Sequence, residues 1–288
     1  MKKTNTQRQG EELNQLSRLI FNDASRLWIY SIIFEIIGIC VSILTVLINF
    51  PSDWKLIPAF IILLILAVAY FFRIRFEYKY DDAETMRRQS VLTEALNWPI
   101  EATQFSDWIL TAGQRILDNF KVKSRDENYY CTNQPTGPRR LLEMTIESAF
   151  FTRHIYCKIK KIVWYIFAFT STAAIIIIGV APIGVVYTKI WIELIYILYL
   201  SLPLIISIDF LGWGLRLNRL TSNIKEIEKG LERLEKNRTS EISEVMRLVY
   251  EYNCQVISGF PIPNFLFKLW HDQIEQLWNK RHKGGWSK

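Results

Sequence analysis

The chain is poor in cysteine, proline, glycine and histidine, and each scarcity excludes a class of protein. Four Cys in 288 residues are too few for a disulfide-stabilised scaffold, and we expect all four to be free thiols. Twelve Gly and nine Pro exclude collagen-like and low-complexity sequences. Only three His occur, and no nucleophile elbow, P-loop, zinc-protease or dinucleotide-binding motif is present. We therefore predict a protein that is not an enzyme, with no catalytic residue, no metal site and no cofactor.

Apolar residues are abundant and are segregated from the charged ones. Half of the chain is hydrophobic and its mean hydropathy is +0.10, although 22% of the residues are charged. A bilayer core needs about 20 helical residues, with ~17 tolerated. Four runs satisfy this: 27–50, 56–72, 162–187 and 190–215. We predict an all-α membrane protein with four transmembrane helices in two hairpins, 27–72 and 162–215. The alternative is a set of buried helices in a soluble domain.

Basic residues predict the orientation of these spans. The turns inside the two hairpins carry one basic residue each, and 33 of the 35 Lys and Arg lie in the other three segments. The positive-inside rule then places both termini and the middle segment in the cytoplasm, beneath a bacterial inner membrane. The cytoplasmic parts are residues 1–26, 73–161 and 216–288. The net charge of +7 follows from topology and from attraction to anionic lipid, so the bilayer is the expected partner and nucleic acid is not.

The first two cytoplasmic parts read as helices. Residues 6–26 form one that leads into the first span. The second span continues to Leu96, where Asn97-Trp98-Pro99 stops it. We expect a further helix over 103–120, a loop over 121–138, and a helix from Arg139 into the third span.

The C-terminal part begins with a short heptad pattern. Its apolar positions are Leu220, Ile224, Ile227, Leu231 and Leu234. They fit either a coiled coil or a helical hairpin within one molecule.

Two more helices are expected after this pattern. Thr239 or Ser240 can cap a helix that extends to Val256. Asn264 can cap a last amphipathic helix, which lies on the membrane surface or docks onto the cytosolic bundle.

Two carboxylates inside the predicted spans are candidate functional groups, because charge within lipid is costly. Glu35 and Asp209 come from different helices but share a depth near the cytoplasmic side. In one alternative, both carboxylates face a bundle interior or an ion path, and in an oligomer their negative charge would favour cations. In the other, they lie near the lipid headgroups and pair with Arg26, Arg73 or Arg216.

Helix kinks are a second candidate feature. The residues concerned are Gly179, Pro182, Gly184 and Pro203. Proline frees a backbone carbonyl and glycine permits close approach of helices, so these positions favour gating or a static kink.

Several stretches resemble one family. Residues 16–26 resemble a Gln-Arg/Leu-Tyr/Ala-Lys element before a first span, although Ser17, Phe21 and Ser25 replace its Gln, Tyr and Lys. Ala83 to Trp98 resembles a cytoplasmic helix that ends in Leu-x-Trp-Asn, here with the order Asn-Trp. The remaining similar stretches are Gly137 to Phe151, the segment Phe260-Pro261-Ile262-Pro263-Asn264, and Lys268-Leu269. With the four-span layout, the chain resembles the SMODS-associated four-transmembrane effectors of bacterial nucleotide-signalling anti-phage systems.

This resemblance implies a membrane effector that oligomerises and permeabilises the membrane when a cytosolic signal, such as a cyclic nucleotide, is sensed. The family supplies no catalytic residues. A charge-plus-aromatic set suited to a nucleotide would be Tyr129, Tyr130, Arg139, Arg140 and Arg153, although these arginines also fit a topology-setting role. The alternative function is a non-conducting receptor or scaffold that recruits partners through its cytosolic helices.

Overall fold

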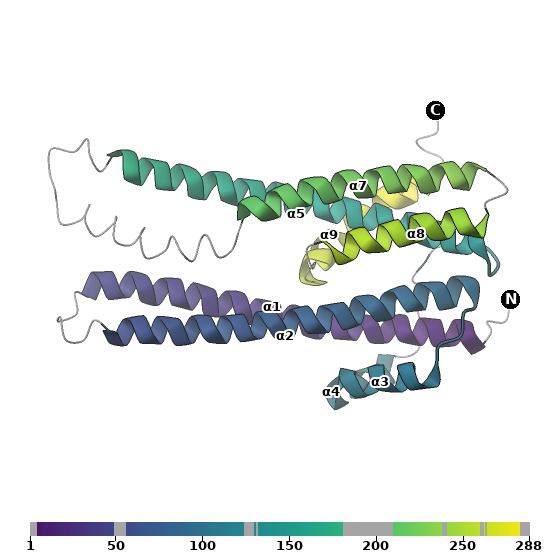
Figure 1. Cartoon of the computed structure of the whole chain (residues 1–288), viewed down its shortest axis with the longest axis horizontal. Coiled ribbons are helices and arrows are strands. Elements are labelled where there is room, and N and C mark those ends of the chain that lie inside the picture. The colour runs from purple at the N-terminus through teal and green to yellow at the C-terminus, as the bar shows by residue number, and fades with distance from the viewer. Residues whose placement is uncertain are drawn as a thin grey trace. The chain divides into compact units, whose positions relative to one another are not determined.

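The computed structural model describes residues 5–48, 56–123, 130, 132–180, 210–237, 241–259, 262 and 264–282. All secondary structure in these residues is helical (Figure 1). The helices are α1 (Asn5–Ile48), α2 (Leu56–Leu96), α3 (Ala102–Ala112), α4 (Gln114–Lys123), α5 (Pro138–Val180), α7 (Phe210–Lys236), α8 (Ile242–Ile257) and α9 (Asn264–His282). The all-helical prediction is confirmed for this part of the chain.

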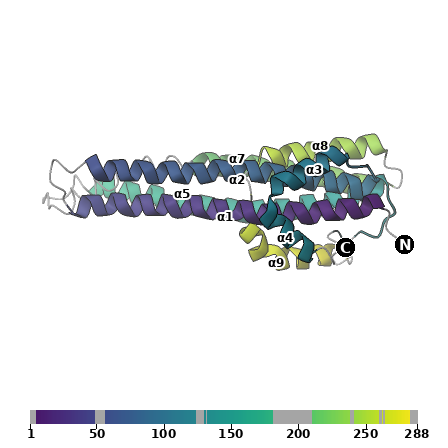
Figure 2. The same ribbon diagram turned by 90° about the horizontal axis from the view of Figure 1, so that it is seen from below.

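The chain divides into two compact units. Unit 1 comprises Met1–Ser25, Glu77–Cys157 and Leu217–Lys288, and unit 2 comprises Arg26–Phe76 and Lys158–Arg216. The helices α1, α2, α5 and α7 each contribute to both units. In each unit the α1 and α2 portions lie side by side (Figure 1, Figure 2).

Unit 1 has an apolar core to which α1, α2, α5, α7, α8 and α9 all contribute. Its most deeply buried large side chains include Leu13, Met86, Leu141, Tyr156, Ile224, Leu231 and Ile274. The α1 and α2 backbones approach closely at Gly10, where an added Cβ would lie 3.1 Å from the backbone nitrogen of Glu94. The heptad residues Leu220 to Leu231 are buried, and Gly230 faces Leu248 of α8. This stripe therefore packs within the molecule, which is the hairpin alternative.

The helices α3 and α4 pack on the α1 and α2 portions of unit 1. Their buried residues Trp108, Ala112 and Ile116 join a cluster with Leu13 and Leu16. The single helix predicted over 103–120 is wrong, because Gly113 adopts φ +78° and separates α3 from α4. The predicted loop over 121–138 begins too early, since α4 extends to Lys123. Residues 124–129 and 131 lie outside the described part.

A backbone hydrogen bond joins the end of α2 to the residue before α5. α2 ends at Leu96 as predicted, and Asn97 has a φ of 59°, which Asn tolerates better than most residues. The backbone N–H of Gly137 donates to the carbonyl oxygen of Ala95 at 2.8 Å. Pro138 then begins α5, a position where its missing N–H costs no helical hydrogen bond.

The last two helices bear on two expectations. The N-cap residue of α8 is Glu241, and the predicted caps Thr239 and Ser240 lie outside the described residues. Asn264, the predicted cap, is the first helical residue of α9, and the helix buries Ile274 and Trp278 in unit 1. Docking onto the helical bundle is therefore the alternative that the structure supports.

Unit 2 contains the most apolar helical segments. α1 and α2 are long and apolar enough to cross a membrane, and only 17% and 11% of their most apolar windows are buried. Phe34 and Phe72 stack at 5.6 Å between ring centroids, and Gly38 faces Ile65. The prediction of four spans is thus supported for two helices. The third predicted span is described only to Val180, and residues 181–209 lie outside the description.

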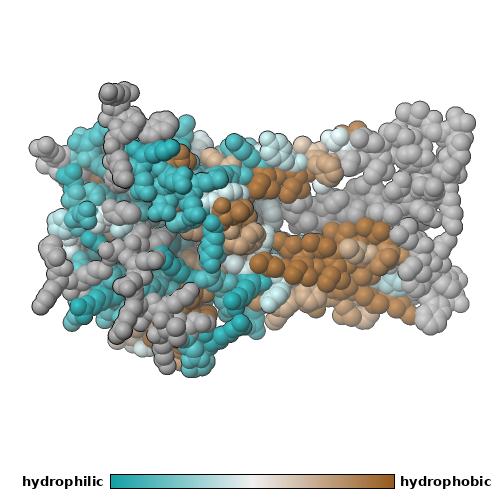
Figure 3. All heavy atoms as spheres, turned by 180° about the vertical axis from the view of Figure 1, so that it is seen from behind, coloured by the Kyte–Doolittle hydropathy of each residue, from teal (hydrophilic) through white to brown (hydrophobic). Residues whose placement is uncertain are grey.

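The outer surface of α1 and α2 in unit 2 is covered by large apolar side chains. The exposed members are Ile29, Tyr30, Ile33, Ile36, Ile37, Leu44, Ile57, Phe60, Ile61, Leu63, Leu64, Val68, Tyr70 and Phe71. Figure 3 shows apolar side chains gathered in one area of the surface. An area of this kind marks contact with lipid or with another protein.

Candidate functional site

The predicted intramembrane carboxylate Glu35 forms an ion pair. Its Oε1 lies 3.9 Å from Nη1 of Arg73, and the Arg73 guanidinium lies 5.5 Å from the ring centroid of Trp213. Arg73 is one of the three partners named for the paired alternative. Its side chain thus contacts residues of α1 and α7.

The other predicted positions in the spans are mostly undescribed. Gly179 lies in the last turn of α5. Asp209, Pro182, Gly184 and Pro203 lie outside the described residues, so their predicted roles stay predictions.

The candidate nucleotide-binding residues are placed separately in unit 1. Tyr130 is buried, with its hydroxyl 3.5 Å from Ser148 Oγ, and Arg139 is exposed. Nη2 of Arg140 donates to Glu94 at 2.6 Å. Nε of Arg153 lies 2.6 Å from Oε2 of Glu228. Tyr129 lies outside the described residues.

Arg140 and Arg153 therefore hold helices together. Glu94 and Glu228 are both buried, and a buried carboxylate is stabilised by a paired guanidinium. The first pair joins α2 to α5, and the second joins α5 to α7. Sequence reasoning identified both arginines but not these partners.

A buried ionic cluster lies on α2. Both oxygens of Glu84 accept hydrogen bonds from Arg87, at 2.6 and 2.9 Å, and Nε of Arg88 donates at 3.2 Å. Burial raises the pKa of Glu84, but the charges and hydrogen bonds of the two arginines outweigh it, so its pKa lies below the usual value. Two guanidinium groups thus share one carboxylate, and Glu84 is ionised at neutral pH.

Tyrosine side chains surround this cluster. Burial raises the pKa of Tyr80 and of Tyr156, and the negative charge of Glu84 adds to both shifts. Thr152 and Tyr252 share a hydrogen bond of 2.8 Å through their hydroxyl oxygens. Because both pKa values are raised, the phenols of Tyr80 and Tyr156 stay neutral at physiological pH and act as polar packing groups.

A small cleft opens beside the two arginines. It is lined by Arg87, Arg88, Val91, Leu92, Thr145, Ser148, Val249, Tyr252 and Asn253. Its free space, about 10 Å³, holds at most one water molecule. Polar and apolar side chains both line the cleft, and it has no room for a nucleotide.

A second ionic cluster joins α5, α7 and α9. Glu228 contacts Arg153 and also accepts a hydrogen bond from Nη1 of Arg281 at 2.5 Å. The Arg281 guanidinium lies 5.2 Å from the ring centroid of Phe150 and also bonds Glu232. Ionic and cation–π contacts therefore hold the C-terminal end of α9 against α5 and α7.

His154 lies beside this second cluster. Its Nδ1 is 2.8 Å from the carbonyl oxygen of Phe150. Burial lowers the pKa of His154, and the positive charges of Arg153 and Arg281 lower it further. His154 is therefore neutral at physiological pH.

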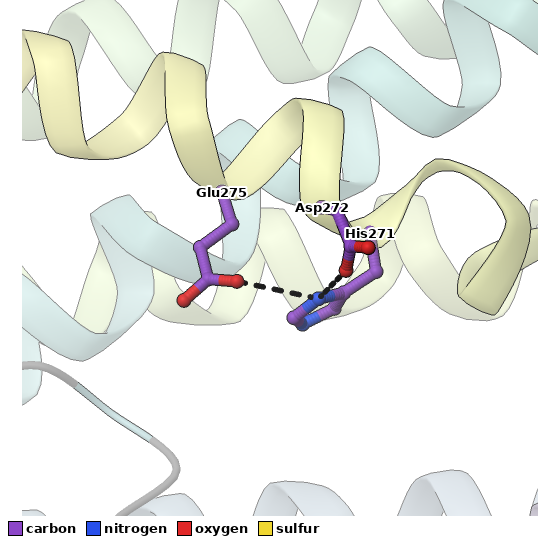
Figure 4. Close-up of side chains that lie close together, drawn as sticks. All are labelled: His271, Asp272 and Glu275. Atoms are coloured by element: carbon purple, nitrogen blue, oxygen red, sulfur yellow. Dashed lines mark ion pairs between the residues drawn. The ribbon is translucent and has the colours of Figure 1, made fainter.

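One set of side chains could contribute to a metal site, although the sequence predicted none. His271, Asp272 and Glu275 of α9 place their ligand atoms within 4.8 Å of one another (Figure 4). Nδ1 of His271 lies 3.6 Å from both carboxylates, but Asp272 is 93% exposed. The motif search missed Glu275, which follows His271 by one helical turn. These contacts also form an ordinary surface ion-pair group.

These features define a class: an all-helical protein with two helices long and apolar enough to cross a membrane, and with a second helical unit held together by buried ion pairs. No protein-family model, curated protein or solved structure matches the chain.

Proposed function

We propose that this chain is a regulated membrane effector that oligomerises and permeabilises a bacterial inner membrane when a cytosolic signal is sensed. The observation that carries the proposal is the apolar surface of α1 and α2 in unit 2. The core helix of a soluble domain is mostly buried, whereas only 17% and 11% of the apolar windows of these helices are buried. Lipid is the solvent that such a surface favours.

The charges support a four-span arrangement with unit 1 in the cytoplasm. Basic residues are concentrated in the segments that form unit 1 and flank the predicted spans. The defence role and the cyclic-nucleotide signal rest on the family resemblance.

A physical route for regulation exists in the buried ion pairs of unit 1. Each buried carboxylate is stable only while its guanidinium partners stay in place, so the packed state is sensitive to a ligand that competes for them. Such a ligand shifts a two-state equilibrium by its differential affinity for the two states. Because α1, α2, α5 and α7 contribute to both units, a repacking of unit 1 acts on helices that extend into unit 2.

Membrane insertion is tested with matched leucines. Leu63 of α2 is 62% exposed and Leu110 of α3 is 79% exposed. A Lys at the centre of a span costs about 2.5–3.5 kcal/mol on insertion scales. Leu63→Lys should lower the amount of protein recovered in the carbonate-resistant membrane fraction, and Leu110→Lys should not. Equal fractionation of the two variants would contradict the proposal.

Permeabilisation is tested by dye release from proteoliposomes that hold the purified protein. A panel of cyclic nucleotides is added on the side of unit 1, and release should follow one of them. Membrane insertion without release under any of them would favour the non-conducting scaffold.

A further inference from the structure

The turn between α8 and α9 lies beside Ser25, two residues before the first apolar run. The backbone N–H of Asn264 donates to Ser25 Oγ at 2.7 Å, and the Asn264 amide contacts Asn22. The backbone N–H of Ile262 donates to the Tyr80 hydroxyl at 3.3 Å. Ser25 is only two residues before Leu27, where the run begins. At about 1.5 Å per helical residue, the start of α9 is within one turn of that boundary.

Only the first turn of α9 lies close to the start of the apolar run at Leu27. Arg281, near the other end of the helix, pairs with Glu228 and Glu232, which lie well beyond Arg216 on α7. α9 therefore leads away from the boundary, and its apolar residues Ile274 and Trp278 are buried in unit 1.

Two large aromatic side chains are exposed at the boundary. Phe265 follows Asn264 directly and is 43% exposed. Tyr78 is 71% exposed and precedes Lys79, which pairs with Asp23 of α1. Asp23 is one turn before Leu27, so Tyr78 and Phe265 lie at similar distances from the apolar run.

A basic side chain lies beside Phe265. Lys268 follows Phe265 by one turn and is exposed. Aromatic rings beside basic groups, at the end of an apolar helix, match the chemistry of an anionic lipid interface.

We propose that Tyr78 and Phe265 form an interfacial anchor, inserted among anionic lipid headgroups, that fixes the α8–α9 turn to the membrane surface. The inference rests on the proposed membrane function and names a lipid contact of unit 1. The anchor couples α9 to the bilayer, although α9 itself is not a span.

The test uses single added cysteines in the full chain, reconstituted in nanodiscs with anionic lipid. A charged, membrane-impermeant maleimide labels them, and peptide mass spectrometry reads each site separately from the native cysteines. Rates are normalised to the unfolded protein, which removes intrinsic reactivity.

The structure offers matched control positions. Tyr250 on α8 is 70% exposed, almost identical to Tyr78 at 71%. It is two residues after Leu248, which packs on Gly230, far along α7 from Arg216. Leu110 on α3 is an exposed control for Phe265, because Trp108 of the same helix packs near Leu13, about 20 Å before Leu27 along α1.

We expect Tyr78→Cys and Phe265→Cys to react about tenfold more slowly than Tyr250→Cys and Leu110→Cys, because lipid headgroups shield them. Equal rates at Tyr78 and Tyr250, with Phe265 as reactive as Leu110, would overturn the anchor. Ile36→Cys, inside the first predicted span, separates the two proposals. If Ile36→Cys is protected and Phe265→Cys is not, only the anchor fails. If Ile36→Cys reacts as fast as Leu110→Cys, the membrane function fails as well.

Discussion

Arg281 and Glu228 join the last helix to the heptad helix, with 2.5 Å between Nη1 and Oε1. They are 53 residues apart in the chain, and the Glu228 side chain is only 3% exposed. Glu228 also faces Arg153, so its loss leaves two guanidinium groups without their shared carboxylate.

Glu228→Gln should therefore destabilise unit 1. Removing one member of a buried ion pair costs about 3 kcal/mol, which corresponds to a fall in Tm of roughly 5–10 °C. Thermal unfolding in detergent, followed by circular dichroism, measures it. Glu226→Gln is the matched control on the same helix, because Glu226 is exposed and pairs only at the surface with Lys229. A Tm for Glu228→Gln equal to that of Glu226→Gln would show that the buried contacts do not stabilise the fold.

The Glu84 cluster predicts a specific dependence on pH. The folded pKa of Glu84 lies below its usual 4.5, so folding favours the ionised form. The resulting stability is fully present above about pH 4.5 and is lost as the pH falls through the folded pKa. The Tm of the wild-type protein should fall between about pH 5 and about pH 3, and that of Glu84→Gln should fall less.

A comparison with Glu251→Gln isolates this effect, since Glu251 is exposed on α8 and pairs with Arg247. Glu251→Gln should keep the acid response of the wild type. If Glu84→Gln also keeps it in full, Glu84 is not the group that responds.

Replacement of Gly10 or Gly38 of α1 by alanine should have opposite effects on stability. A Cβ at Gly10 would lie 3.1 Å from the backbone nitrogen of Glu94 and 3.2 Å from the carbonyl oxygen of Ser90. Backbone atoms of a packed helix cannot yield, so Gly10→Ala should cost about 1–3 kcal/mol. A Cβ at Gly38 would make ordinary contacts of 3.5 and 3.7 Å with Ile65 and Leu66. Gly38→Ala should be neutral or stabilising, because alanine favours helix. Thermal unfolding of both variants measures these changes. A Tm of Gly10→Ala equal to that of the wild type would contradict the close approach of α1 and α2.

The ion pair of Glu35 and Arg73 predicts that substitutions of these two residues have coupled effects on the stability of unit 2. Glu35→Gln or Arg73→Gln alone leaves one charge in apolar surroundings, so each should lower the Tm. The double variant should lose less than the sum of the two, and the double-mutant cycle measures the coupling. Strict additivity would mean that the 3.9 Å contact carries no energy. Ion selectivity of Glu35→Gln in proteoliposomes then reports separately on whether Glu35 lines an ion path.

Sequence patterns predicted the features that repeat along one helix. The heptad positions from Leu220 to Leu231 are buried together on one face of α7. α2 ends at Leu96, three residues before Pro99, and the apolar runs from Leu27 and Leu56 form helices. Periodicity reports which face of a helix is apolar, and this information is local.

Contacts between distant helices were not predictable in this way. No period pairs Arg140 with Glu94 or Arg153 with Glu228, because each pair depends on how two helices pack. The break at Gly113 was missed because one glycine in an apolar pattern fits either a helix interior or a helix end. Glu84 was missed because no apolar period marks a buried carboxylate, and only its arginine partners make its burial tolerable.

The hydrogen bond from Gly137 to Ala95 has a consequence for how the chain could be rebuilt. α2 ends at Leu96, and Gly137 returns to a carbonyl only one residue before that end. Everything between them, including α3 and α4, is therefore topologically an insertion whose two ends meet. A short linker could replace this lobe without changing the order of the remaining helices, and a reporter domain could be inserted there.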